Sequence, residues 1–168
     1  FVLETTQHRI KEKTFLQNHG FPVTEFLEVN SLEDLQKSVT QLDCSAILKT
    51  AAWGYDGKGQ TTVEPTDDLT RIWADMDTAA AILEAKVDFQ NELSIMVARG
   101  SDGHTVCYEP TLNIHRRHIL DVSRALGDFD NSTIEDAQAI ARGVVEALDV
   151  VCLLYTSDAA DERSCGVL

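Results

Sequence analysis

Residues Trp53-Gly54-Tyr55-Asp56-Gly57-Lys58-Gly59-Gln60 place three glycines and a lysine in one short stretch, soon after the apolar run 46–48 and Lys49. Glycine adopts positive φ at little steric cost and lets the backbone approach a ligand closely. Successive backbone N–H groups in such a loop can form an anion-binding concavity, and a neighbouring lysine adds a point charge suited to phosphate. A flexible hairpin between two strands has the same composition. The stretch therefore predicts either a phosphate-binding loop or a plain turn.

The segments around this loop predict an α+β fold. Ser31 with Asp34, and Ser132 with Glu135, resemble the capping boxes that begin helices. Apolar and polar residues alternate between 91 and 99, as in a half-buried strand. We expect helices over 9–19, 32–42, 67–76 and 134–148, and strands over 23–29, 46–50, 60–63, 81–85, 91–99, 104–112 and 118–122. Helix–strand units thus precede an antiparallel array, and we expect two lobes that meet near the glycine loop.

The composition excludes several classes of protein. The 168 residues carry 28 acidic and 14 basic side chains, a formal charge of −14, which disfavours non-specific binding to nucleic acid. The chain has no polybasic segment for an anionic membrane, no apolar run of about 18 residues, and no signal-peptide pattern at its start. The cysteines (Cys44, Cys107, Cys152 and Cys165) form no CxxC or zinc spacing. We therefore expect a reduced, cytoplasmic protein.

Single residues outside the loop carry weak signals. Lys49 ends an apolar strand and points either into a cleft or to solvent. Glu84 ends the apolar run 81–83, where a buried carboxylate needs a partner or a ligand; the alternative is a strand end that faces water. Glu92 begins the alternating strand, where exposure is the default, and His115 in a polar cluster is more often structural than catalytic. Arg99 is either an anion contact or a solvated charge. The sequence shows no nucleophile triad and no metal-ligand spacing.

The order of these motifs closely resembles one family, the N5-carboxyaminoimidazole ribonucleotide synthetases of the ATP-grasp superfamily. The resemblance rests on GYDGKGQ at 54–60, on FxxELS at 89–94 and on ARGxDG at 98–103, and it covers nearly all of 7–151. It implies an ATP-grasp fold fragment. Residues 1–80 would hold the end of the N-terminal region and the ATP-lid subdomain. Residues 81–151 would begin the larger, antiparallel-sheet subdomain.

The resemblance also implies a role for each matched position. Lys49 would contact the ATP phosphates, and Glu92 would contact the nucleotide ribose. His115 would line the nucleotide site. The loop that closes over the phosphates would consist of Gly54, Tyr55, Asp56, Gly57, Lys58, Gly59 and Gln60, and the hinge that reads the adenine edge would consist of Glu84, Ala85, Lys86 and Val87. Tyr55 and Asp56 would also reach the aminoimidazole ribonucleotide. The chain departs from the family at 51–53, where arginine is frequent, and at 109–110, where the proline is shifted by one residue.

The reaction of this family is the ATP-dependent carboxylation of 5-aminoimidazole ribonucleotide with bicarbonate, through carboxyphosphate, in purine biosynthesis. The resemblance places the Mg²⁺ ligands and the bicarbonate contacts beyond Val151, so we expect this chain by itself to be inactive. The full-length parent would be a homodimer. Two alternatives stay open: another ATP-grasp carboxylate–amine ligase, or a non-catalytic nucleotide-binding module.

The last segment, 152–168, has no periodicity that continues the pattern before it. It resembles a translated adapter used to build sequencing libraries. We therefore expect the natural sequence to end near Val151 and the remainder to be a non-native tail.

Overall fold

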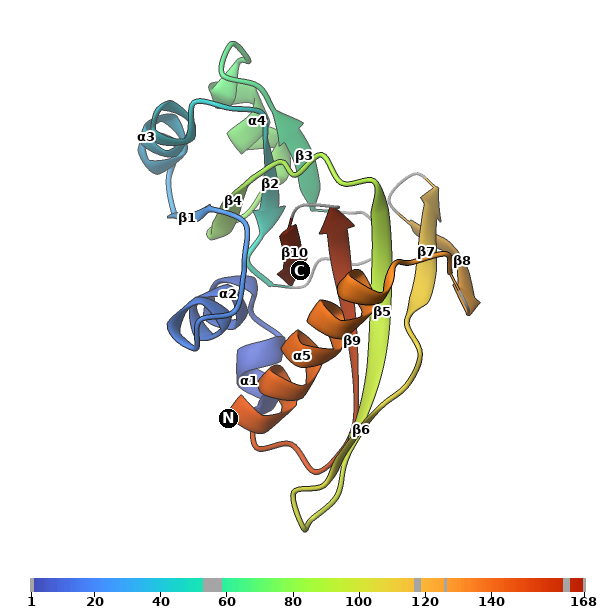
Figure 1. The fold of residues 1–168 in the computed structure, drawn as a ribbon. Coiled ribbons are helices and arrows are strands. Elements are labelled where there is room, and N and C mark those ends of the chain that lie inside the picture. The colour runs from blue at the N-terminus through green and yellow to red at the C-terminus, as the bar shows by residue number, and fades with distance from the viewer. Residues whose placement is uncertain (1, 53–58, 117–118, 126, 162–163, 168) are drawn as a thin grey trace. The chain divides into compact units, whose positions relative to one another are not determined.

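The computed structural model describes residues 2–52, 59–116, 119–125, 127–161 and 164–167, and the chain folds into two compact units (Figure 1). The first consists mainly of Leu3–Thr14 and Thr24–Val87, and the second of Phe15–Val23 and Asp88–Leu168. Both units combine helices with antiparallel strands, so the α+β prediction is confirmed. No helix of the described residues is long and apolar enough to cross a membrane.

The first unit contains a four-stranded sheet with the order β1-β4-β2-β3, in which all neighbours are antiparallel. Its elements are α1 (Val2–Thr6), the start of α2 (Arg9–Asn18), β1 (Phe26–Val29), α3 (Leu32–Leu42), β2 (Ala46–Thr50), β3 (Gln60–Val63), α4 (Leu69–Met76) and β4 (Ala81–Ala85). The strand β4, with which the second expected domain begins, thus pairs within the sheet of the first unit.

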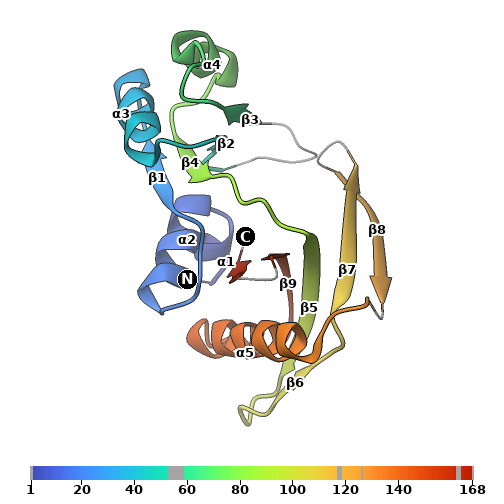
Figure 2. The ribbon, with the colours of Figure 1, turned by 45° about the horizontal axis from the view of Figure 1, so that its top comes forward.

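Two helices cover one face of this sheet. Figure 2 shows α3 and α4 side by side, and their apolar residues pack with alternate residues of the strands. The buried members of this core are Val29, Leu35, Val39, Ala46, Leu48, Val63, Ala81 and Leu83. The capping box of α3 is confirmed, because the Ser31 hydroxyl accepts a hydrogen bond from the Asp34 N–H at 3.1 Å. Asp34 in turn accepts from the Asn30 N–H.

The second unit contains a six-stranded antiparallel sheet with the order β10-β9-β5-β7-β8, and β6 pairs separately with β5. Its elements are β5 (Asn91–Arg99), β6 (Thr105–Cys107), β7 (Thr111–Arg116), β8 (Ile119–Ala125), α5 (Asn131–Ala147), β9 (Cys152–Asp161) and β10 (Ser164–Val167). The expected alternation in 91–99 is confirmed, because Leu93, Ile95 and Val97 are buried in one cluster with residues of α5.

Three details of the second unit differ from the prediction, and the first is that the strand expected over 118–122 runs from Ile119 to Ala125. The single return strand expected over 104–112 is divided into β6 and β7, with Pro110 between them, which has no N–H to donate to a ladder. The helix expected to begin after Ser132 begins at Asn131 instead. Its N-cap is Asp130, whose carboxylate accepts from the Thr133 N–H at 2.7 Å and from the Ser132 hydroxyl.

The segment 152–168, which the sequence suggests is a non-native tail, contributes β9 and β10. The backbone of β9 pairs with β5 from Asn91 to Arg99. The origin of this segment therefore stays a prediction, but its backbone forms part of the second sheet.

Candidate functional site

A buried ion pair lies on the face of the first sheet opposite α3 and α4. In the antiparallel register of β2 and β4, Ile47 pairs with Glu84 and Lys49 pairs with Ile82. Lys49 and Glu84 are therefore diagonal neighbours on one face. The Lys49 Nζ donates a hydrogen bond of 2.8 Å to Glu84 Oε2, and the side chains are only 12% and 3% exposed. The structure thus brings together two of the residues that the sequence singled out.

The helix α2 adds two charged residues to this face that the sequence reasoning missed. The Lys13 Nζ lies 3.6 Å from Glu84 Oε2, and the Lys13 side chain is 3% exposed. Burial lowers the pKa of Lys13, and the nearby Glu84 charge opposes that shift. Burial raises the pKa of Glu12 to about 7, against the attraction of Arg9 and Lys13. One signal for Lys13 is visible: it lies three residues after Ile10 and three before the buried Leu16, in the middle of an apolar stripe.

The expected hinge follows directly from Glu84, and several of its backbone groups are already bonded. The Ala85 N–H donates to the Glu25 carbonyl at 2.9 Å, and the Lys86 N–H donates to the Ser45 carbonyl at 2.9 Å. The Ala85 carbonyl accepts from the Thr24 hydroxyl at 2.9 Å. A carbonyl oxygen accepts two hydrogen bonds. The Ala85 carbonyl therefore has capacity for one further hydrogen bond.

The two strands that flank the glycine loop form a regular hairpin base. Gln60 pairs with Lys49, and the Gly59 carbonyl accepts from the Thr50 N–H at 2.8 Å. Gly59 has φ of 74°, and a Cβ there would lie 2.8 Å from Thr50 Oγ1, so this position requires glycine. The candidate residues Gly54, Tyr55, Asp56, Gly57 and Lys58 lie outside the described residues.

The second unit brings together the other two candidates. Glu92 in β5 pairs in register with Asn113, and His115 lies two residues further along β7. The His115 Nδ1 lies 3.1 Å from Glu92 Oε2; the glutamate side chain is 11% exposed and the imidazole 34%. These two residues form one polar pair at the start of β5.

Beside this pair lies a buried, uncharged network. The Asn113 amide donates to the Ser94 hydroxyl, and the Ser123 hydroxyl donates to Asn113 Oδ1 at 2.8 Å. Ser94 and Asn113 are 1% and 6% exposed. The network joins β5, β7 and β8 through neutral groups, which explains how these polar side chains tolerate burial.

Arg99 has a structural explanation. Its guanidinium donates to the Asp149 carboxylate at 2.9 Å and to the Val150 carbonyl at 3.1 Å. It thus ties the end of β5 to the segment that follows α5. These contacts favour a structural role for Arg99 over that of an anion contact.

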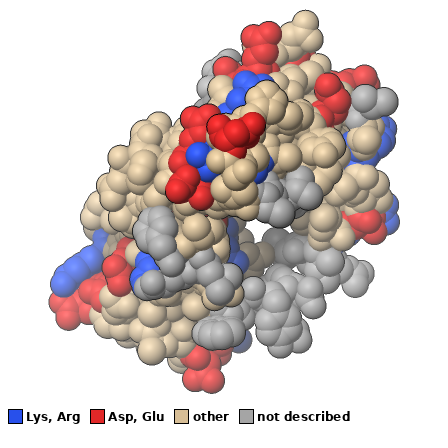
Figure 3. Space-filling model, turned by 90° about the horizontal axis from the view of Figure 1, so that it is seen from below, with Lys and Arg blue, Asp and Glu red and all other residues tan. Residues whose placement is uncertain are grey.

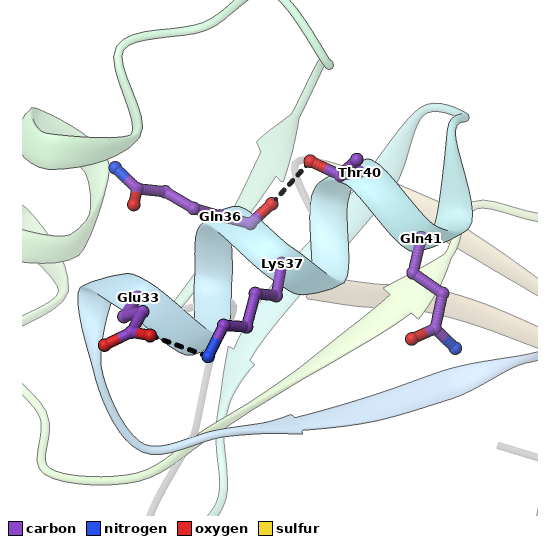
Figure 4. A pocket seen from close by; sticks show the side chains of 5 residues that line it. All are labelled: Glu33, Gln36, Lys37, Thr40 and Gln41. Carbon is purple, nitrogen blue, oxygen red and sulfur yellow. Dashed lines mark hydrogen bonds and ion pairs between the residues drawn. The ribbon is translucent and has the colours of Figure 1, made fainter.

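Two other features do not form a site. A surface hollow of about 450 Å³ is lined by Glu33, Gln36, Lys37, Thr40 and Gln41 (Figure 4), all exposed residues of α3 alone, with a 2.7 Å pair between Lys37 and Glu33. On the face shown in Figure 3, the described Lys and Arg side chains lie in small groups among Asp and Glu. In the described part of the chain, no three His, Cys, Asp or Glu side chains are grouped as metal ligands.

Comparisons with known proteins identify the family and the fold of the chain. A family model described as "ATP-grasp domain" matches residues 14–155. The chain is 40% identical over 123 residues to a bifunctional purine synthesis protein of Dictyostelium discoideum, covering 71% of this chain and 12% of that protein. It is 33% identical over 155 residues to the N5-carboxyaminoimidazole ribonucleotide synthase of Brucella melitensis, covering 91% of this chain and 43% of the relative.

A solved structure gives the same result for the fold. The ADP complex of an N5-carboxyaminoimidazole ribonucleotide synthetase matches 99% of this chain with a TM-score of 0.93 and 29% identity, over 45% of its own length. The expected ATP-grasp fold is thereby confirmed. The chain spans less than half the length of these relatives.

Proposed function

The chain belongs to the ATP-grasp family, and on this basis we propose that it is the nucleotide-binding part of a 5-(carboxyamino)imidazole ribonucleotide synthase. The observation that carries the proposal is the buried pair of Lys49 and Glu84 at the start of the hinge. A buried charge pair is weak evidence for stability, because its desolvation offsets much of its attraction. The pair lies next in the chain to the expected hinge and to the glycine loop, and this position favours a role in ligand binding. The named relatives of purine synthesis support the choice of substrate.

Each candidate residue has a role in this proposal. The Lys49 ammonium turns to the phosphates of ATP, and the glycine loop closes over them. The adenine edge is read by the segment from Glu84 to Val87, through the backbone groups that are open to a ligand. Glu92 accepts from a ribose hydroxyl, and the imidazole of His115 keeps that carboxylate in place.

Phosphoryl transfer depends mainly on positioning and on charge neutralisation, which suits lysines and a loop rather than a covalent nucleophile. The proposed reaction transfers the γ-phosphoryl group of ATP to bicarbonate, which gives ADP and carboxyphosphate. The carboxyl group then passes to the amine of aminoimidazole ribonucleotide, and inorganic phosphate leaves. Tyr55 and Asp56 are proposed contacts of that second substrate. Mg²⁺ would assist, but the described residues offer no ligand group for it, so we derive no step through the metal.

The remaining parts of the proposal concern the parent protein. We place the lid subdomain in residues 1–80 and the start of the larger subdomain in 81–151. The parent is proposed to be a cytoplasmic homodimer, and this chain alone to be inactive, because it spans only 43% of a synthase such as that of Brucella melitensis. ATP- and bicarbonate-dependent turnover of aminoimidazole ribonucleotide by this chain alone would contradict that last point.

Calorimetric titration tests the nucleotide-binding role. We expect ADP to bind more tightly than adenosine, and Lys49→Met to lower the affinity for ADP by about tenfold, the effect of losing one charge-assisted contact. Lys37→Met is the matched control, because Lys37 is an exposed lysine of α3 that is 69% accessible. The proposal fails if adenosine binds as tightly as ADP, or if Lys49→Met and Lys37→Met behave alike.

A further inference from the structure

Lys13 is a buried charged residue to which the proposed function gives no role. Its side chain is 3% exposed, and its Nζ makes no hydrogen bond with the described residues. A lysine usually keeps its ammonium in water while its stem lies along apolar surface. An ammonium that is buried without hydrogen bonds is costly. The ion pair with Glu84, at 3.6 Å, is longer than a hydrogen bond, so in this state it offsets the cost of burying Lys13 only in part.

Glu84 has two lysine neighbours, at unequal distances from the same oxygen. The Nζ of Lys49 lies 2.8 Å from Oε2 and that of Lys13 lies 3.6 Å from it. The second oxygen, Oε1, is buried and accepts no hydrogen bond from the described residues. An ammonium–carboxylate hydrogen bond is about 2.7–2.9 Å long. A movement of less than about 1 Å would thus bring Lys13 into direct contact with Glu84.

The charges of these groups leave one positive charge available for a ligand. Two ammonium groups face the Glu84 carboxylate, so either lysine is sufficient to pair it; Glu12 also acts on both lysines, and Arg9 acts on Glu12 with the opposite charge. If Lys49 alone paired it, turning Lys49 to a phosphate would leave a carboxylate that is 3% exposed without a counterion. Such an uncompensated buried charge is strongly unfavourable, and it would oppose phosphate binding.

On the premise of the proposed nucleotide binding, we propose that Lys13 is a positioning residue that takes over the carboxylate of Glu84 when Lys49 turns to a nucleotide phosphate. Lys13 does not touch the nucleotide. It acts through Glu84, by keeping that carboxylate paired in the bound state. The free protein needs it less, since Lys49 then holds Glu84 directly.

The test compares ADP with adenosine in titrations of the complete chain. We expect Lys13→Met to lower the affinity for ADP by about tenfold and that for adenosine by less than about twofold, because only ADP draws Lys49 from Glu84. Lys13→Arg keeps the charge and is expected to retain most of the affinity for ADP. Lys37→Met is again the matched control and should change neither affinity. Circular dichroism verifies that each variant is folded; Lys13→Gln replaces Lys13→Met if the latter is not.

A double-mutant cycle separates this role from a purely structural one. In a Glu84→Gln background the neutral amide needs no counterion, so adding Lys13→Met should change the affinity for ADP by less than about twofold. Equal losses for ADP and adenosine, or a tenfold loss that persists in the Glu84→Gln background, would overturn the inference. If the unmodified chain binds ADP no better than adenosine, the proposed function fails and the inference fails with it. If Lys49→Met is selective for ADP but Lys13→Met is not, only the inference fails.

Discussion

The two units bury polar side chains in opposite ways. The first unit buries charge: Lys13, Lys49 and Glu84 lie together on one face of its sheet. Among the described residues of the second unit, the most deeply buried polar side chains are neutral: Ser94 and Asn113 are less exposed than the charged Glu92, and they join Ser123 in a network of hydrogen bonds. A neutral network that bonds to itself costs little to bury, whereas ions cost several kcal/mol each in desolvation. The difference indicates that the second network serves the fold, and it supports the proposed role of the first cluster in ligand binding.

The largest expected effect comes from Glu84→Gln, which leaves two buried ammonium groups without their shared carboxylate. We expect the first unit to lose about 3–5 kcal/mol of unfolding free energy at pH 7, as when one partner of a buried ion pair is removed. Trp73 lies in α4 of this unit, and the sequence has no tryptophan in 15–23 or 88–168, so urea unfolding followed by tryptophan fluorescence measures this unit.

The loss of stability caused by Glu84→Gln should become smaller as the pH rises. Burial lowers the pKa of Lys13, so Lys13 loses its proton earlier than an ordinary lysine as the pH rises. The destabilisation by Glu84→Gln should therefore shrink toward high pH. Glu33→Gln in the exposed pair with Lys37 is the control and should leave the unfolding curve unchanged. If Glu84→Gln lowered the unfolding free energy by less than about 1 kcal/mol, the charged cluster would behave like an exposed ion pair, and its contrast with the neutral network would be lost.

A smaller effect is expected from Asn113→Ala in the second unit. The substitution deprives the Ser94 and Ser123 hydroxyls of a partner, and we expect a loss of about 1–3 kcal/mol. Native-state hydrogen exchange of the β5 and β7 amides measures this loss in the second unit. Because the three side chains do not titrate, the loss should be the same at pH 6 and pH 9. If the loss changed with pH, the stability of the network would depend on a titrating group, and the contrast between a charged cluster and a neutral network would be wrong.

The sequence predicted most elements of the first unit because their signals are local. The helix 32–42 has its cap and apolar stripe within its own residues, and the strands 46–50, 60–63 and 81–85 match the observed bounds. Glu84 could be recognised as a special position because it directly follows three apolar residues. In the second unit, the N-cap of α5 is Asp130 and not the expected Ser132, because the Asp130 carboxylate accepts a hydrogen bond from the Thr133 N–H.

Lys13 could not be predicted in the same way. Its burial depends on the docking of α2 against the sheet, which brings it to a carboxylate 71 residues further along the chain. Within α2 it is a lysine between Glu12 and Thr14, and most lysines at such positions are solvated. The pairing of Glu92 with His115 also depends on strand register, although the family resemblance already placed both residues in one site.

The smallest predicted effect concerns Glu12, at the edge of the charged cluster. Burial raises the pKa of Glu12 from 4.5 to about 7 in the folded chain. Between these two pH values the folded state holds a proton that the unfolded state has released, so stability falls as the pH rises from about 4.5 to 7.

The variant Glu12→Gln has no carboxylate to titrate at this position and should remove this dependence of stability on pH. Relative to the unmodified chain, the variant should gain about 1 kcal/mol between pH 5 and pH 8, a figure reduced for the partial exposure of the carboxylate. Urea midpoints from tryptophan fluorescence at pH 5, 6, 7 and 8 test this, with Glu33→Gln as an exposed control. Parallel curves for Glu12→Gln and the unmodified chain would mean that the carboxylate is solvated, and that the buried charge of the first unit is confined to Lys13, Lys49 and Glu84.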